Sequence, residues 1–194
     1  MSTNHPSRAG RVWWLHPGFL LLAGIALGAL VLVVYRDVSE PPESDLIPQF
    51  PASSHLRVLE VLDGSWTVRD LDGTELKLAA LRGKPVFINF WATWCGPCIA
   101  EMPSIEKLYD SMKDEGVAFV IVSDEREEIV RSFAASRHVN LPFYLFKGRV
   151  PRVLYSDEIP ATFILNRQGE VVFKHVGMAD WSTVDSQRFL RSLL

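Results

Sequence analysis

Two cysteines three residues apart are the residues whose type and spacing most directly suggest chemistry. Cys95 and Cys98 lie in the stretch WATWCGPC at residues 91–98, and the chain contains no other cysteine. An apolar run precedes the pair and a helical pattern follows it, so we expect a strand to end and a helix to begin at Cys95. Helix N-termini favour anions, which predicts a depressed pKa for Cys95 and an attacking thiolate. Cys98, one turn further on, would resolve the mixed disulfide.

Two other roles for a C-x-x-C pair are less consistent with the sequence. A structural zinc site needs four ligands, and neither a second cysteine pair nor a suitable spacing among the five histidines supplies them. An inert disulfide that closes so short a loop would constrain the unfolded chain only slightly. The pattern therefore favours a reversible dithiol–disulfide couple that uses no metal and no other cofactor.

Periodicity in the rest of the chain predicts the elements that position the pair. The apolar run predicts a buried strand at 84–90, and spacings of three and four predict a helix from 95 or 96 to 115. An Asp-Gly turn between alternating runs predicts a β-hairpin at 65–78. The remaining expected elements are a short edge strand at 56–62, a helical turn at 79–82, a strand at 117–122, a helix capped by Asp124, a strand at 143–146, a solvated loop at 147–152, a hairpin at 161–175, and a helix at 180–194 whose apolar face includes Val184.

Three motifs carry a family resemblance: FINFWATWCGPC at 87–98, EMP at 101–103 and IPAT at 159–162. Through them the chain, from about residue 49 to 194, resembles thioredoxin-fold proteins of the membrane-anchored TlpA/ResA type. The resemblance implies an α/β thioredoxin fold, a mixed central sheet flanked by helices, with an N-terminal β-hairpin extension and one transmembrane helix before it. It also implies that Pro160 is cis and faces the disulfide, where the Ile159 backbone and the Trp94 side chain would bind substrate.

Two polar residues near the pair are candidates for moving the proton of Cys98, which must become a thiolate to resolve a mixed disulfide. Asn89 stands where cytoplasmic thioredoxins carry a buried aspartate, and it has no titrating proton. Glu101 follows Cys98 by one helical turn and matches a glutamate of the ResA type. Partial burial against Trp91 or the Pro160 loop would raise its pKa toward the working pH, and the alternative is a solvated helix-surface carboxylate.

The stretch 18–35 contains no charged residue and is near the lower limit for spanning a bilayer core of about 30 Å. Arginines precede it and acidic residues follow it, so the positive-inside rule puts the N-terminus in the cytoplasm. We therefore expect a cytoplasmic segment at 1–17, a transmembrane anchor at 18–35, a linker at 36–54 and a thioredoxin-like domain at 55–194. A cleaved signal peptide is the alternative, but the small residues that it needs fall too early in the run.

These features predict a thiol–disulfide oxidoreductase held by a single pass in a bacterial inner membrane, with its catalytic domain in the periplasm or otherwise outside the cytoplasm. Gly-Pro between the cysteines is the dipeptide of thioredoxin, so we expect a protein-disulfide reductase. The resemblance implies oxidised protein substrates, for example in cytochrome c or copper-site assembly, and a membrane thiol donor of the DsbD/CcdA kind. The alternatives are a copper-binding chaperone that uses the two thiolates and a peroxiredoxin-like peroxidase. The net charge of −3 argues against binding to nucleic acid, which needs an excess of positive charge.

Overall fold

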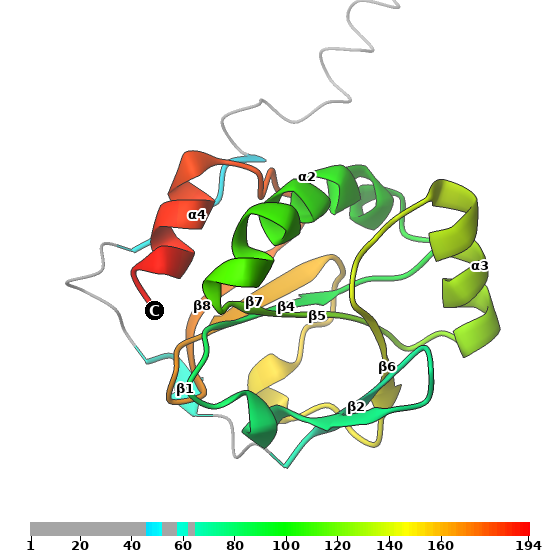
Figure 1. Cartoon of the computed structure of the whole chain (residues 1–194), viewed down its shortest axis with the longest axis horizontal. Helices are drawn as coiled ribbons and strands as arrows, with labels where there is room; N and C mark the ends of the chain where they lie inside the picture. Colours follow the sequence, from blue (N-terminus) through cyan, green and yellow to red (C-terminus); the bar gives the residue numbers. More distant parts are fainter. Residues whose placement is uncertain (1–45, 52–57, 62–64) are drawn as a thin grey trace, which may run out of the picture. The chain divides into compact units, whose positions relative to one another are not determined.

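A mixed sheet of eight strands forms the centre of the domain, in the order β1-β8-β7-β4-β5-β6-β2-β3 (Figure 1). The computed structural model describes residues 46–51, 58–61 and 65–194. The strands are β1 (Glu60–Val61), β2 (Thr67–Asp70), β3 (Glu75–Lys77), β4 (Val86–Phe90), β5 (Ala118–Ser123), β6 (Phe143–Lys147), β7 (Ala161–Leu165) and β8 (Glu170–Val176). The α-helices are α2 (Gly96–Met112), α3 (Glu127–Arg137) and α4 (Val184–Arg191).

The expected membrane anchor at 18–35 and the N-terminal segment at 1–17 lie outside the described residues. Of the expected linker at 36–54, the structure describes 46–51. Within the described ranges, no helix is both long enough and apolar enough to cross a membrane.

The strand before the cysteines, β4, lies in the middle of the sheet and is buried along its whole length. It pairs in parallel with β5 and antiparallel with β7. Successive side chains of a strand point to opposite faces, so Phe87 joins the cluster formed with α2 and α4, whereas Val86, Ile88 and Phe90 join the cluster on the other face. The predicted buried strand is confirmed, and it leads directly into the loop that carries Cys95.

The helix after the cysteines, α2, is confirmed with nearly the predicted bounds. It ends at Met112, and a 3-10 turn continues it over Lys113–Glu115. Gly116 then has φ 92°, a left-handed conformation that glycine adopts at little cost. Its buried residues recur at helical spacing and pack on the sheet: Cys98, Glu101, Met102, Ile105, Leu108 and Met112.

Both predicted hairpins are confirmed, and the first one extends the sheet. In the turn between β2 and β3, the Asp70 carboxylate accepts hydrogen bonds from the N–H groups of Asp72 and Thr74, at 2.9 and 2.8 Å. β2 also pairs antiparallel with β6, so the hairpin forms the sheet edge next to that strand. β7 and β8 form the second hairpin, and β1 is a two-residue edge strand beside β8.

Two details of the predicted helices are wrong. The helix expected to be capped by Asp124 begins later, at Glu127, and its N-cap residue Arg126 makes no side-chain cap. The segment between Asp124 and Glu127 is not helical, and within it the Glu125 N–H donates a hydrogen bond to Ser123 Oγ at 3.2 Å. The last helix, expected at 180–194, spans only Val184–Arg191, and Val184 does not belong to its apolar face, since it follows the N-cap Thr183 and is 66% exposed.

Residues 46–51, within the expected linker, pack against the domain. The Phe50 ring lies 4.7 Å from the ring of Phe173 and 4.6 Å from the ring of Phe189, centroid to centroid. The Leu46 carbonyl accepts a hydrogen bond from the Asp180 N–H at 2.7 Å. An aromatic side chain in this position adds apolar contact area to the core and aromatic contacts beyond that area.

Phe50→Ala should therefore lower the free energy of unfolding by about 2 kcal/mol, somewhat below the cost of truncating a fully buried phenylalanine. Urea unfolding of the purified protein, followed by tryptophan fluorescence, measures the change. The matched control is Ile47→Ala in the same segment, because Ile47 is 38% exposed and should cost less than about 0.5 kcal/mol. Equal midpoints for the two variants would show that the Phe50 ring contributes nothing to stability.

Candidate active site

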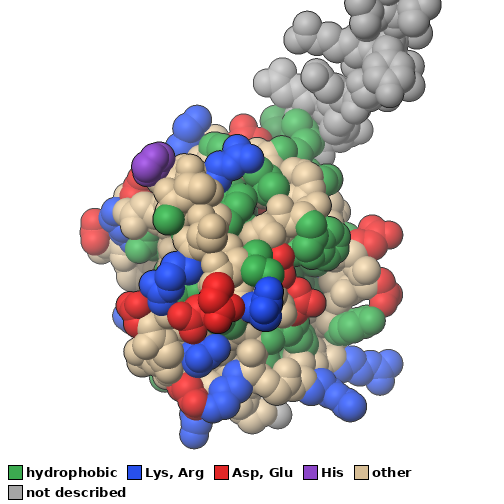
Figure 2. All heavy atoms as spheres, turned by 90° about the vertical axis from the view of Figure 1, so that its right-hand side faces the viewer, with side chains coloured by type: hydrophobic (Ala, Val, Ile, Leu, Met, Phe, Trp, Pro, Cys, Tyr) green, Lys and Arg blue, Asp and Glu red, His purple; other side chains and the backbone are tan. Residues whose placement is uncertain are grey.

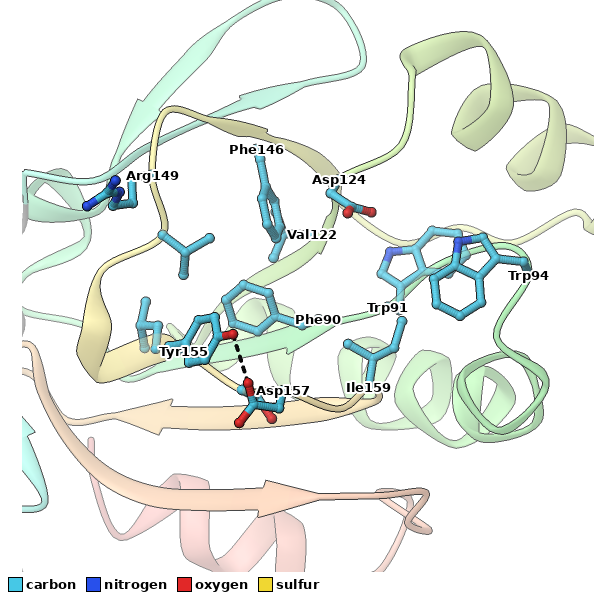
Figure 3. A pocket seen from close by; sticks show the side chains of 13 residues that line it. Phe90, Trp91, Trp94, Val122, Asp124, Phe146, Arg149, Tyr155, Asp157 and Ile159 are labelled. Atoms are coloured by element: carbon cyan, nitrogen blue, oxygen red, sulfur yellow. Dashed lines mark hydrogen bonds between the residues drawn. The ribbon is translucent and has the colours of Figure 1, made fainter.

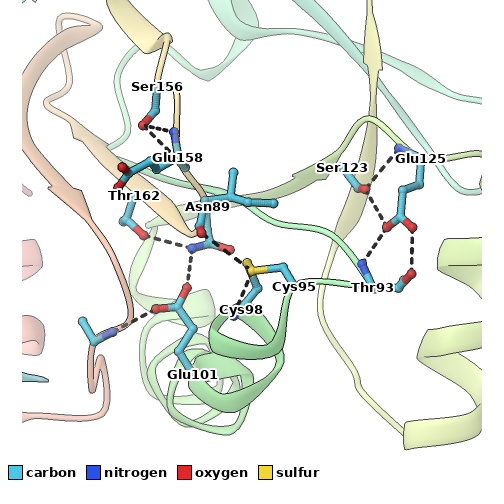
Figure 4. Close-up of a disulfide and its surroundings, with 12 residues drawn as sticks. Asn89, Thr93, Cys95, Cys98, Glu101, Ser123, Glu125, Ser156, Glu158 and Thr162 are labelled. Atoms are coloured by element: carbon cyan, nitrogen blue, oxygen red, sulfur yellow. Dashed lines mark hydrogen bonds between the residues drawn. A yellow bond between two sulfur atoms is a disulfide. The ribbon is translucent and has the colours of Figure 1, made fainter. Parts of the chain in front are cut away.

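The cysteine pair lies where β4 leads into α2, and the two residues form a disulfide with an S–S distance of 2.10 Å (Figure 4). Cys95 is the N-cap of α2, and its Sγ accepts a hydrogen bond from the Cys98 N–H at 3.2 Å. Pro97 occupies the first turn, where a missing N–H costs little. Cys95 is 6% exposed and Cys98 is fully buried, so an incoming disulfide can reach only the Cys95 sulfur.

The peptide bond between Ile159 and Pro160 is cis, as the resemblance implies. The Ile159 carbonyl oxygen lies 3.7 Å from Cys95 Sγ, which places this backbone beside the disulfide. Trp94 stands next to Cys95 in the chain, and its side chain is 72% exposed. Trp94, Ile159 and Pro160 are thus close to the sulfur atoms, and their role in substrate binding stays a prediction.

A groove of about 400 Å³ lies on one side of Trp94 and Ile159 (Figure 3). Its lining is mostly aromatic and apolar and includes Phe90, Trp91, Phe146 and Leu154. On the face shown in Figure 2, hydrophobic side chains are exposed among interspersed acidic and basic ones. The sequence indicated only a solvated loop at 147–152, yet Arg149 and Val150 of that loop line the groove. The composition of the loop contains no signal for this role, which depends on how the loop folds over β4 and β6.

Glu101 is buried, with 2% of its surface exposed, and is not the solvated carboxylate considered as the alternative. Its Oε1 accepts a hydrogen bond from Asn89 Nδ2 at 2.9 Å, and its Oε2 accepts from the Ala179 N–H at 3.0 Å and from Trp181 Nε1 at 3.1 Å. Burial raises the pKa of Glu101 to about 7, although these three donors act in the opposite direction. Its polar partners come from β4 and the turn before α4, which the sequence did not indicate.

Asn89 connects Glu101 to the sheet. Its Nδ2 donates to Glu101 Oε1 and also to Thr162 Oγ1, each at 2.9 Å, and Thr162 is its partner in the β4–β7 register. Both amide hydrogens are therefore used, which fixes the orientation of the amide group. The amide oxygen is buried and has no hydrogen-bond partner among the described residues.

Glu125 is a residue near the site that sequence reasoning missed. Its Oε2 accepts hydrogen bonds from the Thr93 N–H at 2.6 Å and from Ser123 Oγ at 3.2 Å, and its Oε1 accepts from Thr93 Oγ1 at 2.7 Å (Figure 4). The signal available in the sequence was positional. β4 and β5 are parallel neighbours, so the loops after them meet at one edge of the sheet.

The described part of the chain holds no group of three or more histidine, cysteine, aspartate or glutamate side chains that could bind a metal ion. At the cysteine pair, the structure places a disulfide at a helix N-terminus, with a buried carboxyl group of raised pKa one turn after Cys98 on the same helix.

Comparison with known proteins agrees with this geometry. A model of the family described as Redoxin matches residues 45–188. The thiol-disulfide oxidoreductase ResA of a Bacillus cereus strain is 37% identical over 115 residues, which cover 58% of this chain and 66% of that protein, just under two thirds of its length. ResA of Geobacillus kaustophilus is 36% identical over 132 residues, which cover 66% of this chain and 74% of that protein.

A solved structure shows the likeness in three dimensions. The crystal structure of a thiol:disulfide interchange protein of the thioredoxin family from Chlorobium tepidum TLS superimposes with a TM-score of 0.60. The match covers 71% of this chain and 99% of that one, at 22% sequence identity. At this identity the comparison supports the fold alone, and it confirms the predicted thioredoxin-like α/β architecture.

Proposed function

Because the chain belongs to the Redoxin family and is of the TlpA/ResA type, we propose that it is a thiol–disulfide oxidoreductase that reduces disulfides in target proteins. The observation that carries the proposal is the difference between the two sulfur atoms. Cys95 caps α2 and is 6% exposed, whereas Cys98 is fully buried, and the two Cα atoms lie 5.3 Å apart. This is the arrangement that a nucleophile and its resolving thiol need.

The reaction follows from the geometry in two exchanges. The Cys95 thiolate attacks one sulfur of the target disulfide, a Cys95–target disulfide forms, and the other target sulfur leaves as a thiolate. Cys98 then loses its proton and attacks Cys95 Sγ, so the Cys95–Cys98 disulfide forms and the second target thiolate leaves. The target gains two electrons and, once its thiolates are protonated, two protons. The proposed acceptor for the Cys98 proton is Glu101, whose pKa of about 7 suits proton transfer near neutral pH.

The proposed direction of electron flow is supported by the residues between the cysteines. Gly96 and Pro97 give the active-site dipeptide of thioredoxin, whose potential is about −270 mV, whereas the oxidant DsbA lies near −120 mV. We therefore expect this couple to donate electrons to targets. Trp94, Ile159 and Pro160 would bind the target segment, because an extended chain can pair with the Ile159 backbone as an added strand.

The proposed setting is the outer side of a bacterial inner membrane. The uncharged stretch 18–35 would be the single-pass anchor, with the N-terminus in the cytoplasm. There a membrane thiol donor of the DsbD/CcdA kind would reduce the Cys95–Cys98 disulfide back to the dithiol. The proposed targets are oxidised proteins such as apocytochrome c or a copper-site assembly protein. Support for this part comes from the charge pattern and from the family resemblance.

Reduction of insulin tests the proposed activity directly. Catalytic amounts of the protein should accelerate the dithiothreitol-driven reduction of insulin, followed as turbidity, and Cys95→Ser should remove the acceleration. A rate equal to that of dithiothreitol alone would contradict the proposal. Stoichiometric Cu(I) binding by the reduced protein, together with that inactivity, would instead support the copper chaperone.

A further inference from the structure

The carboxylate of Glu125 is bound to the loop that carries Cys95, and the reaction described above does not use it. Thr93 contacts it through both its backbone N–H and its hydroxyl group. Thr93 stands two residues before Cys95, and the Cys95 N–H closes a turn onto the Ala92 carbonyl at 3.1 Å. The position of Cys95 is therefore tied, through a short and hydrogen-bonded loop, to the side chain of Glu125.

The contacts of Glu125 are those of an ionised carboxylate. All three partner groups donate, and the two carboxylate oxygens accept, so none of these contacts uses a proton on Glu125. Glu125 takes part in none of the ion pairs found among the described residues. Hydrogen bonds from neutral donors stabilise the Glu125 carboxylate but do not neutralise it. A half-buried negative charge therefore remains beside the active-site loop.

This charge acts on Cys95 at short range. Two residues span at most about 7 Å of chain, and the hydrogen bond to Thr93 and the Cys95 side chain each add about 3 Å, so the carboxylate lies within roughly 13 Å of the Cys95 sulfur. A half-buried charge at that distance changes a thiol–thiolate equilibrium roughly three- to tenfold. Among the described residues, four other carboxyl groups lie near the site, two of them in the lining of the groove. Asp124, Asp157 and Glu158 are exposed, so water and salt screen them, and the fourth is the buried Glu101.

We propose that Glu125 is a positioning residue of the redox site, which fixes the loop before Cys95 and makes the couple a stronger electron donor through its charge. The inference rests on the proposed function, because it concerns the strength of the same reaction. The helix N-terminus stabilises the Cys95 thiolate, and the Glu125 charge opposes this stabilisation. A less stable thiolate shifts the balance between dithiol and disulfide toward the disulfide, with two electrons passing to the target.

Glu125→Gln tests the charge separately from the contacts. The amide oxygen of glutamine can accept from the Thr93 N–H and its NH₂ group can donate to Thr93 Oγ1, so the loop keeps its support. We expect the pKa of Cys95 to fall, measured as thiolate absorbance against pH. The equilibrium with glutathione should move about three- to tenfold toward the dithiol. Glu125→Met, which is apolar and of similar length, should give a shift in the same direction if the glutamine variant does not fold.

Two control variants separate the charge of Glu125 from charge in general and from loop geometry. Glu128→Gln removes an exposed carboxylate on α3, outside the Thr93 contacts, and should leave the Cys95 pKa unchanged. Thr93→Val keeps the Glu125 charge while removing one contact, and should keep the glutathione equilibrium near that of the wild type. The proposal is overturned if Glu125→Gln titrates like the wild type, or if Glu128→Gln shifts Cys95 equally. A wild-type protein that does not equilibrate with glutathione would contradict the proposed function instead.

Discussion

Cys98→Ser should stop multiple turnover and accumulate a mixed disulfide between Cys95 and the target. Cys98 is fully buried, and its Cα lies 5.3 Å from that of Cys95, so in the wild type the resolving thiol is always within reach of the Cys95 sulfur. In the variant, a thiol from solution must attack the mixed disulfide, and such a thiol is not held next to the Cys95 sulfur. We expect release of the target to slow by more than about a thousandfold. Non-reducing gels and mass spectrometry of the trapped species measure the effect and identify the target.

Cys95→Ser is the matched control for this trapping experiment. Cys95 is the N-cap of α2, and serine is among the residues preferred at that position, so the variant should fold normally. It should trap nothing, because the remaining thiol is buried. Trapping by Cys95→Ser at a level similar to that of Cys98→Ser would reverse the assignment of nucleophile and resolving thiol.

Glu101→Gln should stabilise the protein at alkaline pH and slow its reaction with target proteins. The pKa of Glu101 is about 7 in the folded protein and 4.5 in the ordinary, solvated state. Between these values the folded protein binds more protons than the unfolded chain, so stability should fall as the pH rises from about 4.5 to 7. The pKa difference corresponds to roughly 3 kcal/mol lost above pH 7. Glutamine removes this loss because it does not ionise.

The expected gain for Glu101→Gln is smaller than the full loss, about 1–3 kcal/mol at pH 8. A glutamine NH₂ group in place of Oε1 would face Asn89 Nδ2, a second donor, so one of the two amides must turn. Urea unfolding of the oxidised protein at pH 5 and pH 8 measures the effect, with Glu106→Gln as a control on a less buried carboxylate of the same helix. Equal wild-type stability at both pH values would show that Glu101 titrates normally.

The same variant, although more stable, should react more slowly. Without a group that titrates near neutral pH, Cys98 loses its proposed proton acceptor, and single-turnover reduction of a protein disulfide should slow by about 10²-fold. Removing the Glu101 charge should also lower the pKa of the reactive cysteine. A variant that is both more stable and slower would indicate that burial of this carboxyl group serves the reaction at the expense of stability.

Sequence patterns predicted the elements that are defined locally. The strand before Cys95 is a continuous apolar run, and the turn at Asp70 uses a side chain that bonds its own backbone, so both were visible in short windows. The cis bond at Pro160 came from the family resemblance, since a lone Ile-Pro dipeptide gives no such indication.

Features that depend on distant segments were not predictable from such windows. Phe50 packs on residues more than a hundred positions away, and Trp181 supplies a hydrogen bond to Glu101 from the other end of the domain. Glu125 lay in a stretch that resembled a helix start, and only the pairing of β4 with β5 brings it to Thr93. The groove beside Trp94 is likewise formed by segments whose approach depends on the whole fold.

The capping contact between Cys95 Sγ and the Cys98 N–H has a thermodynamic consequence. A charged sulfur accepts a stronger hydrogen bond than a neutral one, so the first turn of α2 favours the thiolate over the other forms of Cys95. Coupling of this kind is reciprocal, and the thiolate must favour the folded first turn by the same free energy. We therefore expect each catalytic cycle to tighten and loosen the first turn of α2, so that the rigidity of the helix end and the charge of Cys95 change together.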